Sequence, residues 1–217
     1  MSKCLPPGKD VVVVSPHLDD AALSLGAAIS RAAREDARVT ILTVLAGDPA
    51  SDEPAGEWDR SAGFATAGEA ARVRREEDAL ACERLGARPV WLPFGDEQYE
   101  RGAPDDEIRA AVVEAAAPGL VLLPGFPLSH DDHRWLHGLL EDAFEPERLG
   151  LYAEQPYAAL GGERPGEPWT RLGAGLGDRR RKLAAYRAYR SQHEPLGKSV
   201  RKILGYELRF GESALLP

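Results

Sequence analysis

The stretch VVVVSPHLDDAALSLG, residues 11–26, passes directly from an apolar run into a cluster of side chains that can bind metals. Four consecutive valines with no polar alternation are typical of a strand that is buried on both faces of a sheet. The run ends at a proline, and His17, Asp19 and Asp20 follow within four residues. Apolar residues then recur at helical spacing, which predicts a helix over residues 21–34. The sequence therefore predicts a buried strand, a polar turn and a helix, in that order.

The same alternation of short apolar runs with longer helical patterns continues along the chain. Further strands are predicted at residues 39–45, 89–94, 120–123 and 150–156, and further helices at 67–85, 105–117 and 133–144. Gly86 follows the second helix, where a glycine suits a left-handed C-terminal cap. The β-α-β-α order predicts an α/β, Rossmann-like three-layer fold, with a mostly parallel sheet and helices on both faces.

The composition fits one globular domain that spans residues 1–217, with residues 1–9 expected to be mobile. Of the 217 residues, 43% are apolar and 29% are charged, which is ordinary for a domain with a full core. The net charge of −8 disfavours a general nucleic-acid binder, since such proteins need clustered Lys and Arg. The basic run at residues 179–182 precedes apolar residues at helical spacing and is expected to be a solvated helix face.

The sequence carries no sign of secretion or of membrane insertion. Its two cysteines, Cys4 and Cys82, are too few for a disulfide framework, which favours a reducing compartment. No apolar segment precedes the first strand as a signal peptide would, and no run is long enough to cross a bilayer. We therefore expect a cytoplasmic protein. The sequence makes no prediction of oligomeric state.

A second polar cluster, SHDDHR at residues 129–134, follows the fourth predicted strand by a few positions. Ligands of such sheets bind beyond the carboxyl ends of the strands, so this cluster and residues 17–20 are expected to meet. Imidazole nitrogen and carboxylate oxygen are zinc ligands, and a catalytic zinc site supplies three of them and leaves a position for water. His17 and Asp20 can supply two ligands from the first cluster. The second cluster offers His130, Asp131, Asp132 and His133.

Other interpretations of these motifs stay open. Asp19 or Asp20 could simply cap the following helix, although a cap would leave the second aspartate and His17 without a role. HRWLH, residues 133–137, has the histidine spacing of a zincin protease, but Arg134 stands where the glutamate is required. Its second histidine is therefore expected to be a packing residue. No G-x-G-x-x-G follows the first strand, which argues against a dinucleotide enzyme.

A long connection at residues 47–66 has little periodicity and is rich in Gly, Pro and Asp. Loops of this length in compact domains are usually functional lids or disordered segments. Trp58 and Phe64 favour a lid, because a purely solvated linker would not need large aromatic side chains. We therefore expect this segment to be an active-site lid that determines specificity, with Trp58 in contact with the substrate.

The two clusters resemble the motifs of the LmbE-like, or PIG-L-type, family of metal-dependent deacetylases, which act on N-acetylglucosaminyl-phosphatidylinositol and related amino-sugar conjugates. The P-H-x-D-D motif of that family is matched by residues 16–20, and its H-x-D-H motif by residues 130–133. The family's helical arginine and the aspartate after its third strand are matched by Arg74 and Asp96. A late helix that closes on Ser-Gln is similar to residues 182–192. The resemblance follows the expected order along nearly the whole chain.

The resemblance implies a zinc-dependent hydrolase that removes an N-acetyl group from an amino sugar or its conjugate. The metal ligands that it implies are His17, Asp20 and His133. A metal-bound water would be the nucleophile, since zinc can lower the pKa of its water toward about 7, and Asp19 would be the general base. The partner would be a small N-acetylated sugar or glycoconjugate, not a nucleic acid. Fe²⁺ or another divalent transition metal is the alternative to zinc.

The remaining implied roles concern the proton and the substrate. His130 would be the electrophile or general acid, oriented by Asp132, and a nearby carboxylate would favour its cationic form. Arg74 and Asp96 would contact the substrate. The chain departs from the family pattern at Ala21, where many members have a glutamate. This departure predicts altered substrate contacts or altered contacts around the ligands, not lost chemistry.

Two further function classes stay open. A metal-dependent phosphoesterase would hold two metals about 3.5–4 Å apart, and the surplus of aspartates allows it. A catalytically inactive member of the same fold would bind a ligand without turnover, although every polar residue that turnover requires is present. One metal equivalent per chain is expected for the deacetylase and two for the phosphoesterase.

Overall fold

The computed structural model describes residues 3–116, 118–193, 197 and 199–217. Its sheet has the strand order β3-β2-β1-β4-β5-β7-β6. The strands are β1 (Asp10–Ser15), β2 (Arg38–Thr43), β3 (Arg88–Trp91), β4 (Leu120–Phe126), β5 (Leu149–Ala153), β6 (Thr170–Arg171) and β7 (Ser213–Leu215). Strands β1 to β5 pair in parallel, whereas β7 runs antiparallel to both β5 and β6. The predicted α/β fold with a mostly parallel sheet is confirmed.

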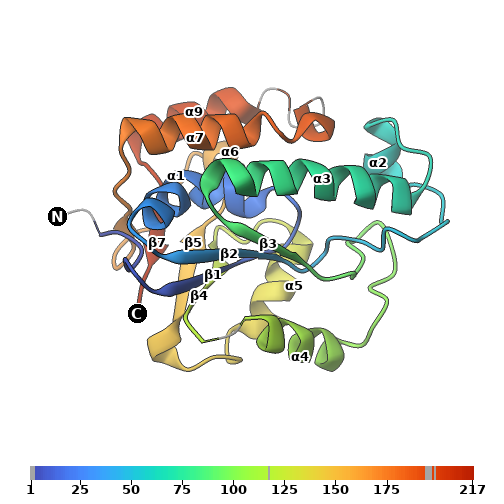
Figure 1. The fold of residues 1–217 in the computed structure, drawn as a ribbon, viewed down its shortest axis with the longest axis horizontal. Helices are drawn as coiled ribbons and strands as arrows, with labels where there is room; N and C mark the ends of the chain where they lie inside the picture. Colours follow the sequence, from blue (N-terminus) through green and yellow to red (C-terminus); the bar gives the residue numbers. More distant parts are fainter. Residues whose placement is uncertain (1–2, 117, 194–196, 198) are drawn as a thin grey trace.

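Helices cover both faces of the sheet, as Figure 1 shows. Helices α1, α3, α7 and α9 lie over one face, and α4 and α5 lie over the other. The helices are α1 (Asp20–Arg34), α2 (Glu57–Ser61), α3 (Ala67–Leu85), α4 (Asp105–Ala115), α5 (Asp131–Leu140), α6 (Tyr157–Gly161), α7 (Leu176–Tyr186) and α9 (Ser199–Arg209). Two short 3₁₀ turns, η1 (Pro146–Arg148) and η2 (Arg190–Gln192), connect other elements. This is the predicted three-layer arrangement.

The four valines of β1 divide between two hydrophobic cores, one on each face of the sheet. Val11 and Val13 belong to the core that contains apolar residues of α1, α3 and α7. Val12 and Val14 belong to the core that contains apolar residues of α4 and α5. Side chains alternate between faces along a strand, so an unbroken apolar run is the pattern that a central strand needs. β1 is hydrogen-bonded to β2 on one side and to β4 on the other.

The predicted helix boundaries agree best with the observed ones where the sequence carries strong capping residues. Helix α3 begins and ends where predicted, because Thr66 accepts a hydrogen bond from the Glu69 N–H and Gly86 adopts φ 76° after the last turn. Helix α5 begins two residues earlier than predicted, because His130 accepts a hydrogen bond at its N-terminus. It also ends four residues earlier than predicted. The short elements α2, α6, β6 and β7 were not predicted, because segments of two to five residues have no measurable periodicity.

The basic run at residues 179–182 lies on α7, but its expected solvation is wrong for one member. Arg180 and Arg181 are exposed, whereas Lys182 is buried. The Lys182 ammonium group bonds to Glu207 of α9 and lies 2.7 Å from an oxygen of Glu212. The lysine therefore ties α7 to the C-terminal segment.

Both cysteines are free, and Cys82 is buried in α3. Within the described ranges, no helix combines the length and the apolar character that a bilayer span requires. The mobility of residues 1–9 stays a prediction; in this segment Leu5 is buried in the core.

Candidate active site

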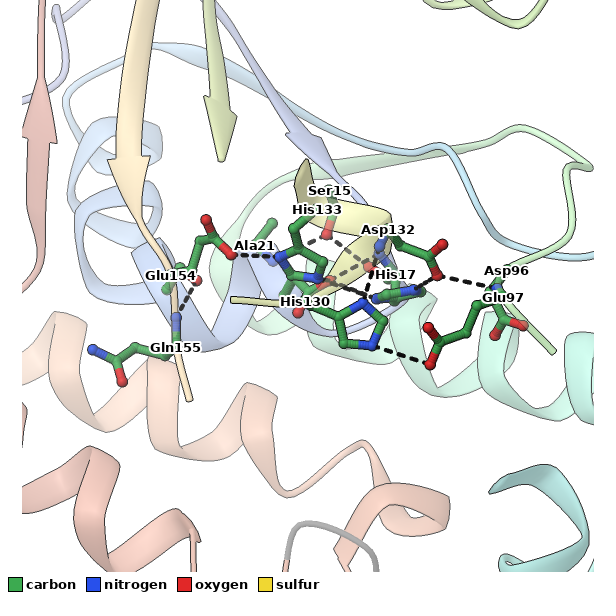
Figure 2. Close-up of polar contacts among 12 residues, drawn as sticks. Ser15, His17, Ala21, Asp96, Glu97, His130, Asp132, His133, Glu154 and Gln155 are labelled. Carbon is green, nitrogen blue, oxygen red and sulfur yellow. Dashed lines mark hydrogen bonds and ion pairs between the residues drawn. The ribbon is translucent and has the colours of Figure 1, made fainter. Parts of the chain in front are cut away.

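The two polar clusters meet at the carboxyl end of the sheet. β1 and β4 are parallel neighbours, with Val12 paired to Val121, so the residues that follow each strand emerge at the same edge. The first cluster opens α1 and the second opens α5. Figure 2 shows the side chains of His17, His130 and His133 gathered at this point. The predicted meeting of residues more than a hundred positions apart is therefore explained by strand order alone.

Three atoms of the predicted metal ligands form a compact triangle. Nδ1 of His17 lies 3.1 Å from Oδ2 of Asp20, and Nε2 of His133 lies 3.2 Å from the same oxygen. The two ring nitrogens are 3.3 Å apart. Ligands about 2.0–2.1 Å from one tetrahedral ion are separated by about 3.3 Å. The donor set and its spacing therefore fit a single zinc-like cation.

A buried carboxylate holds the far nitrogen of each of these two imidazoles. Nε2 of His17 lies 2.9 Å from Oδ2 of Asp132. Nδ1 of His133 lies 2.5 Å from Oε2 of Glu154. Such pairs fix the tautomer and the orientation of a ligating histidine. His17 accordingly presents Nδ1 to the triangle, and His133 presents Nε2.

The electrostatics of the site favour positive charge at the triangle. Burial lowers the pKa of His17, but the hydrogen bonds to Asp132 and Asp20 outweigh it and raise the pKa to about 10. Burial likewise lowers the pKa of His133, and the charge of Asp20 with the bond to Glu154 raises it to about 9. Carboxylates that favour protonated imidazoles in this way would also favour a bound divalent cation.

Asp19 occupies the position before α1 without capping it. Its side chain accepts no capping hydrogen bond, so helix capping does not explain this aspartate. Burial, followed by the charge of Asp20, raises the pKa of Asp19 to about 7. The group therefore exchanges a proton near neutral pH, which suits a general base.

His130 and Asp132 are in contact, but through the backbone of Asp132 instead of its carboxylate. The Asp132 N–H donates to Nδ1 of His130 over 3.2 Å. The carboxylate instead bonds to His17, to the Arg101 guanidinium and to the Glu97 N–H. Burial lowers the pKa of His130, and the neighbouring His17 and His133 lower it further. Burial and the neighbouring histidines thus both act against the expected cationic form of His130.

A cavity of about 340 Å³ opens beside the triangle. Seven of the nine predicted site residues line it: His17, Asp19, Asp20, Trp58, Arg74, Asp96 and His130. The other two, Asp132 and His133, are fully buried behind these residues. The structure thus brings all nine predicted residues into one region.

The residues predicted to contact substrate have defined neighbours. Nη1 of Arg74 lies 3.2 Å from Oδ1 of Asp59, so this arginine contacts the segment at residues 47–66. Its Nε is buried and has no partner among the described residues. Asp96 accepts hydrogen bonds from the backbone and side chain of Gln98. These contacts fix both charged groups at the wall of the cavity.

The segment at residues 47–66 folds against the cavity and contains α2. Its Trp58 is 41% exposed, and its indole N–H donates to Oε1 of Gln192 over 3.1 Å. The Trp58 backbone N–H donates to Oε1 of Gln98 over 2.7 Å. The hydroxyl of Tyr99 donates to Asp59 over 2.7 Å. Whether this segment opens and closes as a lid stays a prediction.

Sequence reasoning missed several residues that contact the site, among them Glu97, whose backbone N–H donates to Asp132. Glu154 follows β5, Arg101 lies in the loop after β3, and Tyr157 begins α6. The Tyr157 ring contacts His133 edge to face, with centroids 5.1 Å apart. The one available signal was for Glu154, a carboxylate within the predicted strand at residues 150–156.

The chain is similar to known deacetylases. Among curated proteins, the chain is 32% identical over 171 residues to a 2'-N-acetylparomamine deacetylase of Streptomyces fradiae, covering 68% of this chain and 57% of that protein. It is 31% identical over 135 residues to a diacetylchitobiose deacetylase of Thermococcus kodakarensis, covering 58% and 45%. The chain thus spans about half the length of these relatives.

Solved structures share the fold over almost their full length. Two structures of a deacetylase of teicoplanin biosynthesis, a zinc-inhibited form and a triple mutant, each give a TM-score of 0.79 over 95% of this chain. They are covered over 97% and 96% of their own chains, at 22% and 27% identity. The family model for PIG-L, the GlcNAc-PI de-N-acetylases, matches residues 12–144. That match takes in well over half of the sequence and both histidine-aspartate clusters, so the chain belongs to the PIG-L family.

Proposed function

We propose that this chain is a metal-dependent hydrolase that removes an N-acetyl group from an amino sugar or an amino-sugar conjugate, with zinc as the expected metal. The observation that carries this proposal is the triangle of His17 Nδ1, Asp20 Oδ2 and His133 Nε2, whose edges are 3.1, 3.2 and 3.3 Å. The curated relatives are deacetylases of N-acetylated amino sugars by name, which supports the choice of reaction.

His17, Asp20 and His133 would hold the ion, and Asp19 would act as the base. When bound, a divalent ion lowers the pKa of water and polarises an amide carbonyl. Asp19 lines the same cavity and its carboxylate is free of capping bonds, so it can take a proton from water. Its pKa of about 7 allows the same group to return that proton to the departing amine at neutral pH.

His130 would stabilise negative charge on the substrate as a neutral hydrogen-bond donor. Its Nδ1 accepts the Asp132 N–H, so a neutral ring carries its proton on Nε2. The ring lines the cavity, and its Nε2 lies 3.5 Å from Oε1 of the exposed Glu97, so Nε2–H would turn from this carboxylate to donate to the developing oxyanion. Removing one such donor typically costs about 3–4 kcal/mol of transition-state stabilisation. We therefore favour the electrophile role for His130 over the cationic acid.

The walls of the cavity suit a polar ring with both donors and acceptors. Asp96 presents a carboxylate, Arg74 a guanidinium and Trp58 an aromatic surface. A small number of convergent polar groups on an otherwise closed surface is typical of small-molecule sites. A sugar that bears hydroxyl groups and one acetamide would match this set.

A second cluster allows the phosphoesterase alternative to be weighed. Ligand atoms of Glu97, His130 and Asp132 lie within 4.8 Å of one another. However, both carboxylate oxygens of Asp132 already accept hydrogen bonds, one from Arg101 and the other from His17 and the Glu97 N–H. Oδ2 thus has both of its lone pairs in use, and an ion at Oδ1 would lie against the positive guanidinium of Arg101. The contacts therefore favour one ion and the deacetylase.

Acetate release from a panel of N-acetylglucosamine conjugates tests the proposal, together with metal analysis of the purified protein. We expect about one metal equivalent per chain and acetate release that Asp19→Asn lowers by about 10²–10⁴-fold without loss of metal. Equal rates for Asp19→Asn and wild type would overturn the mechanism. Two metal equivalents with phosphate ester hydrolysis would establish the phosphoesterase, and metal binding without turnover on any conjugate would establish the inactive member.

A further inference from the structure

Glu154 is a fully buried carboxylate at the edge of the candidate metal site. It follows β5, and its backbone N–H donates to the Phe126 carbonyl at the end of β4 over 2.7 Å. Its side chain reaches His133, with 2.5 Å between Oε2 and Nδ1. Figure 2 shows this carboxylate on the side of the His133 ring away from His17. The sheet therefore delivers a fixed negative charge to the rear of one metal-ligand candidate.

The partners of Glu154 are few. Its second oxygen, Oε1, accepts the Leu128 N–H over 3.3 Å, and no ion pair with lysine or arginine reaches it within the described residues. A buried carboxylate is costly unless hydrogen bonds and opposite charge compensate it. The main partner that compensates the buried Glu154 carboxylate is the His133 ring, together with any positive charge on that ring.

We propose that Glu154 is a positioning residue that keeps the His133 proton on Nδ1 and so aims the Nε2 lone pair at the cation site. The inference rests on the proposed cation site but not on the deacetylation reaction. The Tyr157 ring packs edge to face against the same imidazole, 5.1 Å between centroids, and prevents it from tilting. With Nδ1 held by Glu154, only Nε2 can face Asp20 and His17.

The alternative is that Glu154 only joins β5 to the loop after β4. Its backbone bond to Phe126 survives any side-chain substitution, and a glutamine would keep an acceptor for the Leu128 N–H. Glu154→Gln therefore preserves both structural bonds and removes the charge behind His133. Loss of the partner behind a ligating histidine typically weakens metal binding by about 10- to 100-fold.

Zinc affinity of the metal-free full chain, measured by chelator competition, provides the test. We expect Glu154→Gln to raise the zinc Kd by about 10- to 100-fold and Glu154→Asp to raise it less, since a shorter carboxylate keeps the charge. Glu141→Gln is the matched control, because Glu141 lies 3.5 Å from His137 on the same helix as His133 but outside the site. Its Kd should stay within twofold of wild type.

A second measurement addresses the ring directly and needs no variant. In a ¹H–¹⁵N spectrum of the zinc-loaded protein, His133 should show a protonated Nδ1 and a metal-shifted Nε2. A zinc Kd for Glu154→Gln within twofold of wild type, or metal on Nδ1 of His133, would overturn the proposal. Both results are independent of acetate release, so the positioning role can hold or fail separately from the reaction. If Glu154→Gln does not fold, the Glu154→Asp affinity and the spectrum decide.

Discussion

Replacing Asp78 with asparagine should make the protein more stable at neutral pH. The Asp78 side chain is only 1% exposed and accepts hydrogen bonds from the Trp91 indole N–H over 2.7 Å and the Tyr189 hydroxyl over 2.8 Å. Burial raises its pKa to about 6, although these two hydrogen bonds act in the opposite direction. Asparagine has nearly the same shape. Its carbonyl can accept from Trp91, and its amide can donate to the rotatable hydroxyl of Tyr189.

The magnitude follows from the difference between folded and unfolded pKa. An aspartate titrates near 3.9 in the unfolded chain, so a folded value of about 6 means that the folded state binds the proton more tightly. The stability contributed by this proton is fully present below about pH 4 and is lost as pH rises through 6. Asparagine stays neutral throughout. We expect Asp78→Asn to exceed wild type by about 1.5 kcal/mol at pH 5 and about 3 kcal/mol at pH 7.5.

Urea unfolding followed by circular dichroism at several pH values between 5 and 7.5 measures this difference. Asp106→Asn is a suitable control, since Asp106 is an exposed residue in the first turn of α4 and should change stability little at any pH. A destabilised Asp78→Asn at pH 7.5, or a gap that does not grow with pH, would refute the reasoning. Either result would mean that the hydrogen bonds to Asp78, and not its burial, dominate its energetics.

Two further predictions concern contacts between distant segments. Lys182→Met should destabilise the protein by about 3–5 kcal/mol in urea unfolding, because it leaves Glu207 and Glu212 without their shared ammonium group; a change below 1 kcal/mol would mean that water replaces the lysine. Trp58→Phe keeps an aromatic ring but removes the hydrogen bond to Gln192, worth about 1 kcal/mol. Hydrogen exchange in α2 should then become about fivefold faster, while α4 amides serve as an internal control and should not change.

Strand β1 and helix α3 could be predicted because the sequence patterns that mark them are local and strong. The valines of β1 have no polar alternation, and α3 has a capping threonine before it and Gly86 after it. The C-terminal third of the sequence has fewer patterns of this kind. Strands β6 and β7 have two and three residues, so their pairing depends on β5 lying alongside and not on any pattern of their own.

In the candidate site, too, some features could be predicted from the sequence and others could not. The positions of His17, Asp20 and His133 follow from two clusters that come after adjacent parallel strands. The role of the Asp132 carboxylate did not follow, because neighbouring residues on a helix point about 100° apart and the sequence does not say which ring each one meets. Its side chain turns to His17, 115 positions away, while its own backbone holds His130. Contacts of this kind depend on packing between elements.

The distribution of arginine around the site supports a divalent ion more directly than the motifs do. Arg101 bonds to the Asp132 carboxylate and Arg74 to Asp59. The carboxylates of Asp20 and Glu154, on either side of the His133 ring, receive hydrogen bonds only from histidines and backbone N–H groups among the described residues. In the absence of an ion, these two buried charges are compensated by protonated rings of His17 and His133, whose pKa values they raise. A cation of charge +2 beside Asp20, with neutral imidazoles, would balance both charges, so the proposed ion should stabilise the fold when it binds.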